Sequence, residues 1–328
     1  MRRLITAALA IALLGGPDLA GPEVAAQTYP TRLVTMVVPL APGGSTDVIG
    51  RLVGESMAKA LGQPVVVENV SGAGGSTGVV RVARSAPDGY TFMIGQWGTN
   101  VATGAIYNMP IDLLTDLQPI GLIATQPFLV VARKSMEAAN LKELLAWLKA
   151  NPQKATQGHA GVGSPGHVSG MFLQKATGLT WAMVAYRSAG PALQDVITGN
   201  IDIALDTPAT SKAHIEAGNI KAFAVTSKSR IPAFPDLPTV EEAGVPGYTF
   251  SFWHALWAPK GIPAEPLNKL SGALKAALSD PALRAKLIGI SQEIFPDAQQ
   301  GPEGLAAFQK AEIETWWPVI KAAGIKPQ

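Results

Sequence analysis

Four glycine-containing turns hold most of the residues that could do chemistry in this sequence. They span residues 41–47, 72–78, 161–167 and 187–193, and each is predicted to follow a strand and to open a helix. A helix start presents unpaired N–H groups and the positive end of the peptide dipoles, and glycine lets the main chain approach a ligand closely. One such turn is equally well explained as a plain connection. Four of them, spread over both halves of the chain, favour one shared anion site between two domains.

The turns do not match the known phosphate-binding sequences. A phosphate loop of the Walker type needs Gly-Lys followed by Ser or Thr, and the sequence has no such triplet. The turn at 72–78 comes close to the dinucleotide fingerprint, but its third glycine, Gly78, falls one position late. The expected acidic residue at the end of the next strand is also absent. A nucleotide is therefore not the predicted ligand.

Serine and histidine side chains near the turns raise the alternative of an enzyme. Ser164 and His167 lie in one turn, so an exported hydrolase is a competing hypothesis, with ester turnover that is lost in Ser164→Ala. The chain has four histidines and no cysteine, and no two histidines have the spacing of a zinc motif. His159 and His167 flank one loop, where ordinary hydrogen bonding is the simpler explanation. No metal, no cofactor and no catalytic residue is predicted.

Two carboxylates and one tryptophan complete the set of candidates. Asp47 is expected to charge the first turn of its helix rather than to act as a base. Asp206 ends the apolar strand "IDIALD" and is expected at the same cleft as the turns, where it accepts a bond from a ligand donor or from a loop N–H. Trp97 ends another strand. Core packing is its default role, and the alternative is an aromatic wall for an organic ligand.

Composition limits the classes of protein that need to be considered. With 47% hydrophobic and 15% charged residues, the 328-residue chain is predicted to be globular. The net charge is +2 and no run of five or six like charges occurs, so nucleic acid is not an expected partner. Arg2 and Arg3 precede a short apolar run and the small residues "VAA", which is typical of a signal peptide, here 1–26. The alternative is a buried N-terminal helix. We expect export to the periplasm.

The elements that must position the turns alternate along the chain. Short apolar runs such as "LVTMVVPL", "PVVVEN" and "YTFMIG" predict strands, and the segments between them predict helices. Strand, helix, strand, helix, strand implies an α/β protein with a parallel sheet and right-handed crossovers. Asn140 is a predicted N-cap, and two helices are expected near 267–279 and 302–323. We expect two domains, 27–123 plus 251–328 and 124–250.

Long blocks of the sequence carry a family resemblance. "VVPLAPGGSTDVIGRLV", "ALGQPVVVENVSGAGGSTG", "GVGSPGHVSG", "AYRSAGPALQDVITGNID" and "WHALWAPKGIP" resemble the substrate receptors of tripartite tricarboxylate transporters, also called Bordetella uptake gene (Bug) receptors. The resemblance covers nearly all of the chain after residue 26. It implies a periplasmic, two-domain binding protein of the Venus flytrap fold, not an enzyme. The resemblance implies that the ligand in the interdomain cleft is a small organic acid, a di- or monocarboxylate that is aromatic in some relatives. It also implies that the receptor is a monomer and that its protein partner is a membrane permease.

Matching motifs carry the ligand-binding residues of the family onto this sequence. The resemblance implies that main-chain amides of the first two turns hold the ligand carboxylate, in part through waters, and that loops of the second domain face them. The implied residues are Gly43, Gly44, Ser45, Thr46, Asp47, Gly74, Gly75, Ser76 and Thr77 from the first domain, and Gly163, Ser164, His167, Tyr186, Arg187, Ala189 and Asp206 from the second.

Several positions depart from the usual family pattern. Leu40 replaces a phenylalanine, Trp97 a small residue, and Met171 a glutamate; the remaining departures are Ser188, His254 and Ala255. We hypothesise that Leu40 and Trp97 together bias the pocket toward a larger or aromatic acid, against the simpler explanation of local repacking. A further alternative is a sensor subunit that presents its ligand to a membrane kinase rather than to a permease.

Overall fold

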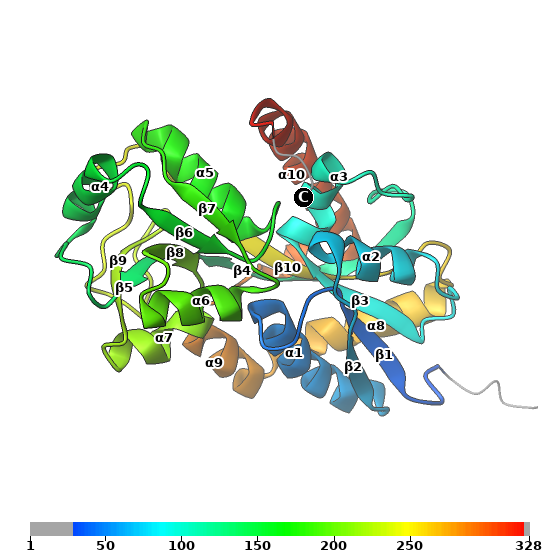
Figure 1. Cartoon of the computed structure of the whole chain (residues 1–328). Coiled ribbons are helices and arrows are strands. Elements are labelled where there is room, and N and C mark those ends of the chain that lie inside the picture. Colours follow the sequence, from blue (N-terminus) through cyan, green and yellow to red (C-terminus); the bar gives the residue numbers. More distant parts are fainter. Residues whose placement is uncertain (1–28, 325–328) are drawn as a thin grey trace, which may run out of the picture.

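The computed structural model describes residues 29–324, which form two lobes, each built on one β-sheet (Figure 1). The first sheet has the strand order β11-β4-β10-β3-β1-β2, and the second has the order β7-β6-β8-β5-β9. The strands of the first sheet are β1 (Val34–Val38), β2 (Val65–Asn69), β3 (Thr91–Gln96), β4 (Leu117–Pro127), β10 (Ser251–Pro259) and β11 (Glu293–Ile294). Those of the second are β5 (Leu129–Arg133), β6 (Thr156–His159), β7 (Ala182–Ala185), β8 (Ile203–Asp206) and β9 (Ile220–Val225).

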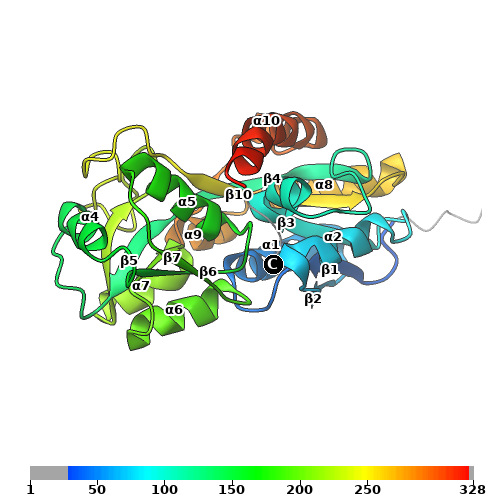
Figure 2. The same ribbon diagram turned by 45° about the horizontal axis from the view of Figure 1, so that its top comes forward.

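Helices cover both faces of each sheet and complete the two-domain α/β fold that the sequence predicts (Figure 2). The first lobe carries α1 (Ser45–Leu61), α2 (Ser76–Ala83), α3 (Thr103–Ile106), α8 (Ala264–Ser279), α9 (Pro281–Gly289) and α10 (Pro302–Ala322). The second carries α4 (Leu141–Ala150), α5 (Pro165–Thr177), α6 (Ala189–Thr198) and α7 (Pro208–Glu216). Short helical turns η1 (Ala73–Gly75), η2 (Gly98–Ala102) and η3 (Asp297–Gln299) link some of these elements.

Burial on both faces explains the nearly continuous apolar sequence of β1. Its even-numbered residues, such as Met36, pack with Ile49 of α1 and Leu270 of α8 in one core cluster. Val37 points to the opposite face, in the cluster that holds Val79 of α2. Because neither face meets water, no polar alternation is required. The pairing of β1 with β2 and β3 is parallel, as predicted for this part of the chain, whereas β10 runs antiparallel to β3 and β4.

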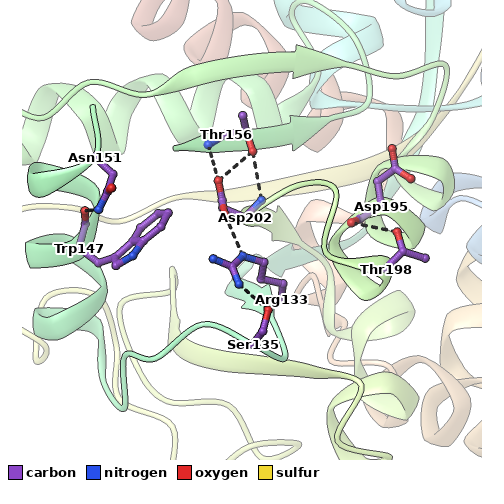
Figure 3. A network of polar contacts seen from close by, with 8 residues as sticks. All are labelled: Arg133, Ser135, Trp147, Asn151, Thr156, Asp195, Thr198 and Asp202. Atoms are coloured by element: carbon purple, nitrogen blue, oxygen red, sulfur yellow. Dashed lines mark hydrogen bonds and ion pairs between the residues drawn. The ribbon is translucent and has the colours of Figure 1, made fainter. Parts of the chain in front are cut away.

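A polar network joins three segments of the second lobe (Figure 3). The Arg133 Nε atom at the end of β5 lies 2.9 Å from Oδ1 of Asp202, which precedes β8. The other carboxylate oxygen, Oδ2, accepts a 3.0 Å bond from the backbone N–H of Thr156 in β6. Strand β8 pairs with β5 on one side, antiparallel, and with β6 on the other, parallel. Asp202 bonds to a residue of each neighbour and so helps to fix the register of the three strands. The loops after β6 and β8 depend on that register.

The chain crosses between the sheets twice. It leaves the first sheet after Pro127, past the expected boundary at residue 124, enters the second at Leu129, and returns between Val225 and Ser251. The crossing segments bind one another, since the Phe128 N–H donates to the Thr226 hydroxyl (2.8 Å) and that hydroxyl donates to the Phe250 carbonyl (2.7 Å). The two crossings therefore lie side by side at the base of the lobes.

Local signals placed most element ends correctly. The Asn140 side chain accepts a 3.0 Å bond from the Glu143 N–H, which confirms it as the N-cap of α4. The two C-terminal helices are confirmed as α8 and α10, and α9, which was not predicted, lies between them. The predicted signal peptide, 1–26, lies outside the described residues. Within 29–324, no helix combines the length and apolar character that crossing a membrane requires.

Candidate functional site

A cleft of about 910 Å³, part of it open to solvent, lies between the lobes and receives residues from both. The first lobe contributes the start of α1, the turn before α2 and the end of β3. The second contributes the loops after β6, β7 and β8, and the crossing segments form the floor. The polar and glycine residues of the wall are Gly44, Ser45, Thr46, Asp47, Gly74, Gln96, Gly98, Gly158, His159, Ser164, Gly166, Arg187, Ser188, Asp206 and Thr207.

The first turn of α1 offers main-chain donors to this cleft. Its N-cap is Gly44, which has no side chain to bond the orphan amides, and the first intrahelical bond runs from Val48 N to Gly44 O at 3.0 Å. The N–H groups of residues 45–47 therefore have no acceptor among the described residues. Unpaired amides at a helix start bind anions.

Asp47 shapes this turn rather than facing a ligand as a free base. Its carboxylate accepts bonds from the Gly43 N–H (3.0 Å), from Arg51 (2.9 and 3.1 Å) and from the Asn69 amide (3.0 Å). Burial alone would raise the pKa of Asp47, but these hydrogen bonds and the Arg51 charge hold it below its usual value. Asp47 is thus ionised and already paired, and it lies in the first turn of α1, where the sequence analysis expected it to place a charge.

Gln96 at the end of β3 adds a side-chain donor that the sequence analysis missed. Its Oε1 atom accepts a 2.7 Å bond from the Gly98 N–H, which orients the amide. The Nε2 group then has no acceptor among the described residues, although Gln96 is buried and borders the cleft. The sequence alone does not distinguish a glutamine that faces a cleft from one that faces solvent. Gln96 is oriented by η2, and no sequence signal predicted that turn.

The second lobe brings two helix starts to the opposite wall. In α5 the N-cap hydroxyl of Ser164 accepts the His167 N–H at 3.3 Å, and Pro165 at the first position needs no partner. In α6 the N-cap is Ser188, which makes no side-chain cap, and the Ala189 N–H has no acceptor among the described residues. Arg187 is exposed beside it and makes no ion pair in the described part of the chain.

Asp206 ends β8 at the same wall and is fully buried within a set of hydroxyl donors. Its Oδ2 atom accepts bonds of 2.5 Å from both Thr210 and Ser211. Burial raises the pKa of Asp206, and the hydroxyl donors and the backbone N–H of Thr207 oppose that rise. The prediction that Asp206 borders the cleft is confirmed, and hydroxyl donors from α7 already bond its Oδ2 atom.

The floor of the cleft is apolar. Phe128 and Phe252 stack with ring centroids 4.9 Å apart, and both border the cleft together with Leu40. Because Phe128 lies in the first crossing and Phe252 is the second residue of β10, just after the return crossing, the floor is built where the chain passes between the lobes. The sequence analysis did not single out either phenylalanine, since neither lies in a turn motif.

The structure brings together part of the predicted residue set. The predicted residues that border the cleft are Gly44, Ser45, Thr46, Asp47, Gly74, Ser164, Arg187, Ala189 and Asp206. Of the second turn only Gly74 borders it. Gly75 is required for another reason, since its φ is +99° and an added Cβ would collide with Thr99. Gly43, Ser76 and Thr77 lie in the predicted turns but outside the wall of the cleft.

Trp97 does not lie where an aromatic wall requires it. Its side chain is fully buried and packs edge-on against Phe250 (5.6 Å between ring centroids) and Trp316 of α10 (5.3 Å). Trp97 does not border the cleft and so does not form an aromatic wall there, whereas Leu40 does border it. The default role, core packing, holds.

Three further predicted residues support the cleft from behind. Tyr186 turns away and donates a 2.5 Å bond to Asp195 of α6. His167 accepts the Gly163 N–H at 3.3 Å and packs behind His159, with ring centroids 4.5 Å apart. Gly163 lies so close to Ile106 of α3 that a side chain there would collide with it.

The geometry of the hydrolase alternative is not assembled. Ser164 accepts the backbone N–H of His167, and no hydrogen bond joins its hydroxyl to the imidazole among the described residues. Ser76 falls within a Gly-x-Ser-x-Gly sequence, 74–78, but no histidine bonds it in the described part of the chain. Over residues 29–324, no three acidic or histidine side chains gather as metal ligands.

Comparison with known proteins decides the family. A family model for the tripartite tricarboxylate transporter family receptor matches residues 49–325. This chain belongs to that receptor family. A curated relative from Agrobacterium vitis, the UPF0065 protein in the TAR-I ttuE-ttuC' intergenic region, is 40% identical and covers 92% of this chain and 87% of its own length. BugT of Bordetella pertussis is 33% identical, with 92% of this chain and 93% of BugT covered. The Bug family resemblance is confirmed.

Solved structures confirm the two-domain fold of the receptor. The periplasmic binding protein BugD is 37% identical with a TM-score of 0.87, over 92% of this chain and all of that chain. MatC of Rhodopseudomonas palustris, solved with bound malate, is 34% identical with a TM-score of 0.84, over 89% and 100% of the two chains. A second R. palustris protein, solved with adipate, is 35% identical with a TM-score of 0.87, over 92% and 100%.

Proposed function

We propose that this receptor binds a small organic carboxylate in the cleft between its lobes and delivers it to a membrane permease. The observation that carries the proposal is that helix starts from both lobes, those of α1, α5 and α6, meet at one cleft. Their unpaired amides favour an anion, and the family relationship favours a solute receptor. Malate and adipate in two structural relatives support a carboxylate as that anion.

The first lobe supplies the principal donors. The amides of residues 45–47 and the Nε2 group of Gln96 lie on one side of the cleft. A carboxylate placed there replaces water on each of these groups. A charge-assisted hydrogen bond contributes about 1.5–3 kcal/mol, and micromolar binding needs about 8 kcal/mol in total. Several such bonds, with apolar contact from Leu40 and Phe252, are sufficient after the ordering costs.

Closure of the lobes links these donors to those of the second lobe. The hinge in this proposal is the pair of crossing segments around Phe128 and Phe250, with domains at 27–123 plus 251–328 and 124–250. Movement about two short crossings is the usual mode of closure in such folds. We further propose that 1–26 is a cleaved signal peptide and that the exported protein works as a monomer without cofactor or catalytic activity.

Native mass spectrometry of the purified protein tests this function. Spectra of the native protein and of the denatured protein, compared after release of any small molecule, are expected to reveal a retained organic acid by its mass. A thermal-shift screen of carboxylates is expected to raise Tm, since a ligand that binds only the folded state stabilises it. A protein that retains no acid and shows no shift with any carboxylate contradicts the proposal.

A further inference from the structure

His159 occupies a central position on the second-lobe wall. It ends β6, which lies between β7 and β8 in the sheet. Its backbone pairs with Ala185 at the end of β7, and Asp206 ends β8 on the other side. His159 therefore borders the cleft between Arg187 and Asp206, and only 3% of its surface is exposed.

One hydrogen bond fixes which nitrogen of the His159 ring carries the proton. Nδ1 lies 3.0 Å from the carbonyl oxygen of Gly161. A carbonyl only accepts, so Nδ1 bears the hydrogen, and in the neutral ring Nε2 then carries a lone pair. Nε2 has no hydrogen-bond partner among the described residues. It is also not one of their unpartnered polar atoms that are fully closed off from solvent. It is an acceptor without a donor.

The surroundings keep this ring neutral. Burial lowers the pKa of His159, with the Gly161 bond opposing, and burial together with His159 lowers the pKa of His167 to about 4. The other charged groups near the ring are Asp206, on the adjacent strand, and Arg187, after the other adjacent strand; Asp47 faces them from the first lobe. At neutral pH His159 is thus an acceptor beside a buried carboxylate.

The two walls of the cleft differ in the hydrogen-bonding groups that they offer to a ligand. The first-lobe wall presents donors, the amides of 45–47 and Gln96. Between β6 and β8 the second-lobe wall presents an acceptor, His159 Nε2, whereas Oδ2 of Asp206 already accepts the Thr210 and Ser211 hydroxyls. A plain carboxylate satisfies the first wall and leaves His159 Nε2 without a donor. A ligand that also carries a hydroxyl or ammonium group satisfies both.

We propose that His159 is a specificity-determining residue that accepts a hydrogen bond from a hydroxyl or ammonium group on the bound carboxylate. This rests on the proposed function and deepens it, because it assigns the ligand to hydroxy- or amino-substituted acids. A site built to bond a polar group discriminates strongly against the analogue that lacks it, because its own polar atom is left unpaired.

Calorimetry with pairs of acids that differ by one hydroxyl tests the assignment. The probes are propionate and lactate, succinate and malate, and phenylacetate and mandelate, with aspartate as the ammonium analogue. For a pair whose members bind the wild type, the Kd of the substituted acid is expected to be lower than that of its partner by about tenfold or more, a difference of about 1.4 kcal/mol. In His159→Phe the preference is expected to fall to about twofold or less. In His159→Gln, which keeps an acceptor, a preference is expected to remain.

A pH series separates this role from a structural one. As the pH falls and the ring takes up a proton, Nε2 becomes a donor, so the preference for the substituted acid is expected to decline in wild type and to stay flat in His159→Gln. Circular dichroism checks that each variant is folded. Carboxylates that bind without any preference for the substituted member, or a preference that survives in His159→Phe, overturn the inference and leave the proposed function standing. Failure of every probe to bind overturns both.

Discussion

The hydroxyl of Tyr107, which follows α3 in the first lobe, lies 3.4 Å from the carbonyl oxygen of Val162 in the second. The same ring lies against Gly74, where an added Cβ would be 3.0 Å from it. Tyr107 thus connects the second glycine turn with the third. The contact joins the two lobes, so the hinge opening proposed above would break it.

Removing this hydroxyl should weaken closure without changing ligand choice. In Tyr107→Phe the lost bond is long, and a typical neutral hydrogen bond contributes about 1 kcal/mol, so the expected rise in Kd is about fivefold or less for every ligand. Calorimetry on two different ligands measures it. A change in the ratio of the two affinities would argue against a role confined to closure.

The Asp47 network should matter for both stability and binding. In Asp47→Ala the Gly43 N–H, Arg51 and Asn69 lose their acceptor, and we expect a loss of about 2 kcal/mol in the free energy of unfolding and weaker ligand binding. Urea denaturation and calorimetry measure the two effects. Glu242→Gln is the control. Its ion pair with Arg230 is half-exposed and such pairs contribute about 0–1 kcal/mol, and a glutamine oxygen can still accept the Thr239 N–H that Glu242 bonds. Equal destabilisation by both variants contradicts the prediction.

Leu40 and Trp97 should behave differently on substitution. Leu40 borders the cleft, so Leu40→Phe reduces its space and should weaken the binding of bulky acids more than that of small ones. Trp97→Phe removes buried contacts with Phe250 and Trp316 and should cost about 2 kcal/mol or more of stability, with ligand preference unchanged. A shift in ligand preference in Trp97→Phe would contradict its placement in the core.

Buried histidines should make the fold sensitive to mild acid. Burial lowers the pKa of His254 to about 3. A group whose folded pKa is lowered stabilises the fold fully above its unfolded value, about 6.5, and loses this contribution as the pH falls from there toward the folded pKa. We expect the free energy of unfolding to fall between pH 6.5 and 4, and less steeply in His254→Gln. Asp206 and Glu312 act oppositely, since burial raises their pKa, so the comparison is between variants. Identical slopes would contradict it.

The sequence predicted those features that local chemistry controls. The turns were visible because glycine, Ser164 and Asn140 mark helix starts through their own backbone and capping preferences. The alternation of strands and helices followed from apolar runs, and Asp206 was placed by the geometry of strand ends. These inferences needed no information from distant parts of the chain.

The remaining features depend on contacts between distant segments. Trp97 is buried because Trp316 of α10 packs on it, which no local pattern reveals. Gln96 and Phe128 face the cleft because of η2 and of the crossing between the sheets. For His159 the sequence favoured ordinary hydrogen bonding over a catalytic or metal role. Its place between the ends of β7 and β8 depends on the strand order of the sheet, which no local pattern reveals.

A crystal structure of the protein with its bound carboxylate is the most direct test of the central claim. The account predicts carboxylate oxygens within hydrogen-bonding distance of amides at the start of α1 and of at least one amide at the start of α5 or α6. A ligand held by one lobe alone, or bound outside this cleft, would contradict it.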